Sequence, residues 1–305
     1  QLYASTLLST YMGRNNKAKI AVAAFDNAST ISIKQVDSAL VNNELIPSNS
    51  VREFFITYTA GQTLWIESDY EVSAYISTEK NQGSGYHWDG RVITAPARVG
   101  LAFVAGAGGT PTGISATQDG TSFDIYRDDG TNFLSQSLDV SGFLQVTNAS
   151  VGQNGPGSAI AFYSDAPIVS TQHADGDGTN ASPSLSKNML STHFVAPMDG
   201  DYVSFAAFDD GQVLVIDETN NVVAVLDLER DGLANAKAPY SATYNPTASG
   251  AGRDVRAGYR FVASVPVLGI FEEYEEDDET LMTGATPPKW VLVSTDFASD
   301  GQLPY

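Results

Sequence analysis

Hydrophobic residues along the chain occur in short runs that predict β-strands. Lys19–Phe25 is such a run and ends at the polar segment Asp26–Ser29, after which Thr30–Lys34 alternates between apolar and polar residues. Short runs of β-branched and aromatic residues bounded by Gly, Asn, Asp and Ser are typical of strands joined by tight turns. No segment keeps the apolar period of a helix over three turns. We therefore predict an all-β fold, in which Ser38–Glu44 and Leu228–Ala236 are the candidates for short helical turns.

Three passages of the chain resemble one another and predict an internal repeat. Each is a hydrophobic run, a small or acidic turn and a second hydrophobic run, and they are Glu67–Tyr75, Tyr163–Thr171 and Val262–Ile270. Ser68 and Ser164 lie 96 residues apart, and Ser164 and Ala263 lie 99 apart. A second matching pair is Ile20–Asn27 and Tyr202–Asp210, with Val99–Val104 as a weaker middle copy. Near-equal spacing and matched order indicate three copies of one unit.

The repeats divide the chain into one large domain and a short extension. We expect a three-repeat β domain at 1–284, with repeats at about 10–90, 91–187 and 188–284, and a C-terminal extension at 285–305. About eight strands per repeat are compatible with three pairs of four-stranded blades that close as a six-bladed β-propeller, and also with three β-sandwiches. Closure removes exposed sheet edges and slightly favours the propeller. In the extension, Lys289–Ser294 is expected to form one more strand, which completes the last blade or is donated to a neighbouring subunit.

The repeat pattern resembles that of a known family. Ala-Ala-Phe-Asp-Asn/Asp, a strand pair, an aromatic or Gly-rich stretch and Ser-Asp-x-Pro-Ile/Val together are similar to the repeats of the IgGFc-binding-protein N-terminal domain family, found in animal mucus-associated and bacterial surface proteins. The residues that carry the resemblance are Ala23–Asn27, Ala206–Asp210, Ser68–Val72, Ser164–Ile168 and Ser264–Val267. The first copy has Glu71 in place of the Pro, and the middle copy lacks the Phe-Asp-Asp turn. The resemblance implies an all-β, extracellular, non-catalytic surface module and assigns no binding residues.

Charge and composition exclude several classes of function. The chain has 36 acidic and 16 basic residues and a net charge of −20, so a phosphate backbone would be repelled and we expect no nucleic-acid partner. No apolar stretch approaches the roughly 20 residues of a membrane helix, so we expect no membrane span. The absence of cysteine excludes disulfides and thiolate chemistry. Because the sequence begins at Gln1, we expect either a mature form from which a secretory signal peptide has been removed or a fragment of a longer chain.

One acidic loop is a candidate metal site. Asp175, Asp177 and Asn180 place three side-chain oxygens on a tight, Gly-containing turn, and Ca²⁺ prefers six to eight oxygen ligands. The alternative is a plain turn in which carboxylates cap backbone amides. The loops expected at the equivalent place in the other copies, His87–Gly90 and Glu272–Glu279, also carry acidic residues. These loops are predicted either to hold divalent cations or to be solvated surface.

These patterns together favour a structural function. No nucleophile elbow, phosphate loop or local metal motif formed by the three histidines is present, so we predict no catalytic residues, no other cofactor and no enzymatic activity. The favoured hypothesis is a non-enzymatic structural or assembly protein of a cell or virion surface, a filament, sheath, coat or appendage subunit that self-associates through its terminal segments. The alternative is a Ca²⁺-dependent adhesin or glycan-binding surface module. Both place the protein outside the cell, on its surface or on a virion.

Overall fold

The protein is built almost entirely of β-strands. The computed structural model describes residues 2–5, 17–36, 38–59, 63–82, 85–93, 96–104, 112–140, 142–146, 158–173, 181–183, 185–230, 235–247, 254–273 and 279–282. Within these ranges the only helical segment is a 3₁₀ turn at Lys187–Met189, so the predicted all-β class is confirmed. The expected helical turn at Ser38–Glu44 is wrong, because these residues belong to a strand. The C-terminal extension, with its expected strand, lies outside the described residues.

The strands fall into three consecutive sets. The first repeat contains β1 (Leu2–Ser5), β2 (Lys17–Ala24), β3 (Ser29–Gln35), β4 (Ser38–Ile46), β5 (Ser50–Thr57), β6 (Thr63–Ser68), β7 (Val72–Gln82) and β8 (Gly85–Val92). The second contains β9 (Ala97–Val104), β10 (Thr112–Ala116), β11 (Thr121–Arg127), β12 (Asn132–Leu138), β13 (Phe143–Val146), β14 (Ser158–His173), β15 (Ala181–Pro183) and β16 (Leu185–Ser186). The third contains β17 (Ser191–Val195), β18 (Gly200–Ala207), β19 (Gly211–Ile216), β20 (Val222–Leu228), β21 (Tyr240–Tyr244), β22 (Arg260–Glu273) and β23 (Glu279–Met282).

All three sets share one strand order. In the first repeat, β1-β6-β3-β4 form one antiparallel sheet and β5-β2-β7-β8 form another. In the second repeat the long strand β14 replaces both β6 and β7: its first half pairs with β9 and β11, and its second half with β10 and β15. In the third repeat β22 does the same, between β17 and β19 and then between β18 and β23. We call β1-β6-β3-β4 and its counterparts the back sheets, and β5-β2-β7-β8 and its counterparts the front sheets.

Each repeat buries its own core between its two sheets. In the first repeat, Ile20 and Val22 of the front sheet and Ile31 and Ile33 of the back sheet are completely buried in one cluster. The residues that alternate with them face outward, as the two-residue period of a strand requires. The second and third repeats have equivalent clusters of their own. A shared core between two sheets is the defining feature of a β-sandwich.

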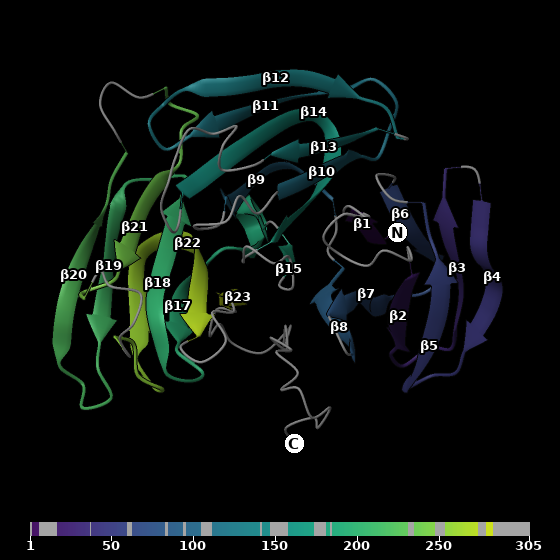
Figure 1. The fold of residues 1–305 in the computed structure, drawn as a ribbon, viewed down its shortest axis with the longest axis horizontal. Coiled ribbons are helices and arrows are strands. Elements are labelled where there is room, and N and C mark those ends of the chain that lie inside the picture. The colour runs from purple at the N-terminus through teal and green to yellow at the C-terminus, as the bar shows by residue number, and fades with distance from the viewer. Residues whose placement is uncertain are drawn as a thin grey trace.

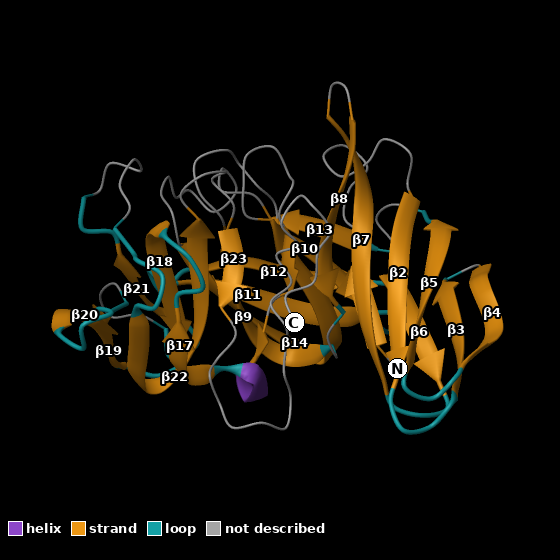
Figure 2. Ribbon diagram, turned by 90° about the horizontal axis from the view of Figure 1, so that it is seen from below, coloured by secondary structure: helices purple, strands orange, loops and turns teal. Residues whose placement is uncertain are grey.

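The arrangement favours the sandwich alternative over the propeller. The described strands form sheets of four, eight, seven and four strands, and each of the two larger sheets joins a back and a front sheet through one shared strand, whereas propeller blades are separate sheets around a channel. Figure 1 shows the three repeats following one another along an arch, with the first repeat at the right, the second at the top and the third at the left. The view from below in Figure 2 shows the same sequence of repeats side by side.

The repeated motif marks the crossing between the two sheets of each repeat. At this crossing a side-chain oxygen accepts a hydrogen bond from a backbone N–H near the start of the neighbouring strand of the back sheet. The pairs are Asp69 with Thr30 at 2.7 Å, Asp165 with Ser122 at 2.9 Å and Ser264 with Gln212 at 2.9 Å. The three acceptors are separated by the offsets of 96 and 99 residues found in the sequence. The three crossings thus recur at the spacing that the repeated motif has in the sequence.

One sequence equivalence is wrong. Val99–Val104 was expected to be the middle copy of Ile20–Asn27, but it lies in β9, which corresponds to β1 and β17. The counterpart of β2 and β18 is β10, at Thr112–Ala116, because β10 pairs with the second half of β14 as β18 pairs with the second half of β22.

Candidate functional site

Outside the three cores, the main side-chain contacts lie where one repeat packs against the next. We call each of these contact regions a seam. Between the second and third repeats, Leu101, Ala159 and Ala161 of a back sheet form one buried cluster with residues of the next front sheet, namely Ala206, Leu268 and Ile270. These residues point away from their own cores, since their sequence neighbours Ala102 and Ile160 belong to the core of the second repeat. The outer surface of one back sheet, which we call a back face, therefore packs on the outer surface of the next front sheet, a front face.

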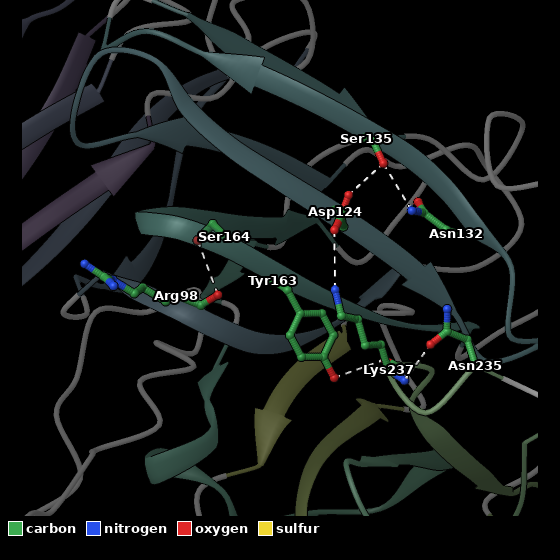
Figure 3. A network of polar contacts seen from close by, with 8 residues as sticks. All are labelled: Arg98, Asp124, Asn132, Ser135, Tyr163, Ser164, Asn235 and Lys237. Carbon is green, nitrogen blue, oxygen red and sulfur yellow. Dashed lines mark hydrogen bonds and ion pairs between the residues drawn. The ribbon is translucent and has the colours of Figure 1, made fainter.

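A lysine joins the polar part of this seam. Lys237, from the segment between β20 and β21, places its Nζ 5.1 Å from the ring centroid of Tyr126 and 5.2 Å from that of Tyr163. The same Nζ lies 3.5 Å from a carboxylate oxygen of Asp124, and the hydroxyl of Tyr163 donates to the Lys237 carbonyl at 3.1 Å. Figure 3 shows Lys237 together with Asp124 and Tyr163 of the preceding repeat.

Contacts within this group stabilise the charged forms of Lys237 and Asp124. The hydrogen bond to Tyr126 and the nearby Asp124 carboxylate raise the pKa of Lys237. The hydrogen bond from Ser135 and the charge of Lys237 lower the pKa of Asp124, and burial raises the pKa of Tyr163. Lysine and carboxylate are thus charged, and the tyrosine neutral, across the neutral range. Because the Lys237 side chain is 45% exposed, its contacts contribute only about 0.5–1 kcal/mol.

The motif Ala-Ala-Phe-Asp-Asp takes part in the seam directly. Phe208 lies 6.4 Å, centroid to centroid, from the ring of Tyr163 in the preceding repeat, and Lys187 lies 5.3 Å above the Phe208 ring. Phe25 occupies the same place after β2, where its side chain is 43% exposed. In the third repeat, Phe208 of this repeated motif is therefore an interface residue.

The seam between the first and second repeats joins the same pair of faces. The hydroxyl of Thr63, which points outward from β6, donates to the carbonyl of Ala116 at 2.7 Å in a buried position. Strand β1 lies against β14. Ser115 and Val169 face away from the core of the second repeat and are nevertheless 0% and 4% exposed. The back face of the first repeat thus covers the front face of the second.

Two faces at the ends of the arch are exposed instead. On the front face of the first repeat, Val51 is 66% exposed and Phe55 is 72% exposed. On the back face of the third repeat, Val195 is 48% exposed and Val225 is 52% exposed. Exposed apolar side chains mark interaction sites in soluble proteins where they gather into a patch.

The metal site predicted from the sequence was Asp175, Asp177 and Asn180, and all three lie outside the described residues. Among the residues that are described, no group of three or more His, Asp or Glu side chains is placed to hold a metal ion. His87–Gly90, expected in a loop, lies in strand β8, so that expectation is wrong. His193 is exposed on β17, where its Nδ1 lies 2.9 Å from the hydroxyl of Thr192.

Comparison of the chain with protein-family models, with curated proteins and with solved structures finds no match in any of the three. In the described part of the chain, no helix is long and apolar enough to cross a membrane. The sequence placed Leu268 in a repeated passage without indicating its role at the seam, and it gave no indication of Lys237.

Proposed function

We propose that this chain is a non-enzymatic structural subunit that assembles on the outside of a cell or of a virus particle, as part of a filament, sheath, coat or appendage. The observation that carries the proposal is the use of the sheet faces. At both internal seams a back face packs on a front face, and the two faces left at the ends of the arch expose apolar side chains such as Phe55 and Val225.

Several features support a structural function over a catalytic one. The polar clusters of the described residues join strands or repeats, as Asp69 and Lys237 do. Asp217 accepts hydrogen bonds from the backbone N–H groups of Thr219 and Asn221, which closes a hairpin. These carboxylates stabilise turns and seams.

Size measurements of the full-length chain test this proposal. Mass photometry and sedimentation velocity over a range of protein concentrations should show species heavier than the monomer, which has a mass of 32.4 kDa. Negative-stain images of the native material should show regular assemblies. A monomer at every concentration, and no assembly in native material, would contradict the structural role.

The extracellular location rests on the resemblance to the IgGFc-binding-protein N-terminal domain family and on the acidic surface. Protease treatment of intact cells or purified particles tests it, since an external subunit is digested while internal proteins survive.

The alternative function is a Ca²⁺-dependent adhesin or glycan-binding module. The favouring observation is topological: residues 174–180 connect β14 to β15, and residues 274–278 connect β22 to β23, so the two acidic segments link equivalent strands of different repeats. Repeated acidic loops at one position are a recurring way to supply oxygen ligands to Ca²⁺.

A further inference from the structure

The exposed back face of the third repeat is the counterpart of a face that is buried within the chain. The register of paired strands shows which residues of the second and third repeats occupy equivalent positions. Leu101 pairs with Ala161 in the second repeat, and Val195 pairs with Arg260, which lies 99 residues after Ala161, in the third. Leu101 is completely buried, whereas Val195 is 48% exposed. The third repeat thus presents an interface position to solvent.

Several positions of the exposed back face are more apolar than their counterparts in the second repeat. Paired positions across β11, β12 and β14 correspond to those across β19, β20 and β22. By this correspondence Asp124, Ser135 and Tyr163 of the second repeat are replaced in the third by Leu214, Val225 and Val262. Arg260 and His193 change the other way, since they replace Ala161 and Val99, so the gain in apolar surface is limited to part of the face.

The front face of the first repeat also gains an apolar residue at one position, although Ser73 there replaces the buried Leu268. Ser241 contacts Asp128 across the internal seam at 3.2 Å, and its counterpart by strand register in the first repeat is Val51. Val51 is 66% exposed, and Phe25, the counterpart of the seam residue Phe208, is 43% exposed. The acid on this face, Glu53, is neutralised by Lys19 at 3.3 Å.

We propose that the back face of the third repeat binds the front face of the first repeat of a second copy of this chain. This inference rests on the proposed structural function and names the surfaces that carry it. The partner is a second copy because the chain itself supplies both faces, and because the internal seams already join these two kinds of face. In the resulting interface Phe25 of one copy packs near Val262 of the next, as Phe208 packs near Tyr163.

The two surfaces are different, so the association is head-to-tail. Such heterologous contacts give a ring if the rotation closes and an open filament if it does not. Because each copy carries a net charge of −20, repulsion opposes the contact and salt screens it. Association therefore strengthens as the salt concentration rises from low to moderate values.

The test uses one substitution on each face of the full-length chain. Val195→Lys disrupts the back face, at the position where the second repeat has the completely buried Leu101, and Val51→Lys disrupts the front face. Lysine lowers the negative charge of the chain, so a loss of association cannot come from added repulsion. Ser137→Lys, at an exposed position of β12 outside both faces, is the matched control. Circular dichroism spectra and thermal melts confirm that each variant is folded.

Mass photometry and sedimentation velocity then give the expected pattern. The wild-type chain and the control form concentration-dependent oligomers. Each face variant associates at least about 30-fold more weakly, because a charged group replaces a valine that is buried in the interface. A mixture of the two face variants retains one intact pair of faces and forms a dimer of one copy of each. Neither variant does this alone.

The other outcomes contradict the inference in distinguishable ways. Wild-type oligomers that both face variants leave unchanged overturn the head-to-tail interface but preserve the proposed structural function. Variants that fail to complement each other in the mixture indicate contact between like faces and also overturn it. A wild-type monomer at all concentrations overturns both proposals.

Discussion

Leu268→Ala tests whether the seam between the second and third repeats is a packed core. Leu268 is completely buried and shares its cluster with Leu101 and with three alanines, Ala159, Ala161 and Ala206. Small neighbours fixed on paired strands cannot move in to fill the space that the leucine leaves. Leu→Ala substitutions at such sites lower the free energy of unfolding by about 2–5 kcal/mol, and we expect about 3 kcal/mol here.

Guanidinium denaturation followed by far-UV circular dichroism measures this effect, at a protein concentration low enough to keep the chain monomeric. Leu101→Ala should cost a similar amount, and the double variant should deviate from additivity by at least about 0.5 kcal/mol because both side chains line one cluster. Val225→Ala, at an exposed position, is the control and should change stability by less than about 0.5 kcal/mol. A loss below about 1 kcal/mol for Leu268→Ala, or strict additivity, would refute a cooperative seam.

Three further predictions concern single sites. Gly200→Ala should lower stability by about 3 kcal/mol in denaturant titrations, because the new Cβ would overlap the Phe271 ring, whereas Gly120→Ala meets open space and should cost about 1–2 kcal/mol for its φ of +69°. Backbone hydrogen bonding lowers the pKa of Asp69. The ionised carboxylate therefore stabilises the folded protein at neutral pH, and this stabilisation is lost as the pH falls through the lowered pKa. The Asp69→Asn variant should lose less stability than the wild-type chain between about pH 5 and pH 2. The adhesin alternative predicts that calorimetry detects Ca²⁺ binding by the wild-type chain and none by Asp175→Ala; no heat and no thermal shift for either chain contradicts it.

The fold class and the repeat could be predicted because their signals are local. Alternating apolar residues and Gly- or Asp-rich turns identify strands such as β3 without knowledge of their partners. The offsets of 96 and 99 residues are visible because each crossing between sheets needs a small polar acceptor, which Asp69, Asp165 and Ser264 supply. A side-chain requirement of this kind leaves a trace in the sequence.

Strand order and edge strands were harder to predict because they depend on distant partners. Strand β1 pairs with β6, and the segment between them gives no sign of this. β4 was mistaken for a helical turn because it is an edge strand with irregular register, and Asn43 within it adopts a φ of 52°. Such a strand loses the alternation by which strands are identified.

The sequence does contain a signal for the seam between the second and third repeats. β18 is buried at every position, and the run Val267–Phe271 in β22 is apolar apart from one glycine, as expected for strands covered on both faces. In an isolated sandwich the outward residues Ala206 and Leu268 would be polar. Lys237 had no such signal, because a lone lysine in an irregular segment is placed only by the surrounding fold.

Disulfide cross-linking between copies tests whether the end faces of the arch join successive chains. The chain contains no cysteine, so Phe25→Cys and Val262→Cys each introduce a single thiol in a separate preparation. Under mild oxidation the mixture of the two should give a covalent dimer, and neither preparation alone should do so. Equal cross-linking of each variant with itself, or no cross-linking in the mixture, would contradict head-to-tail stacking.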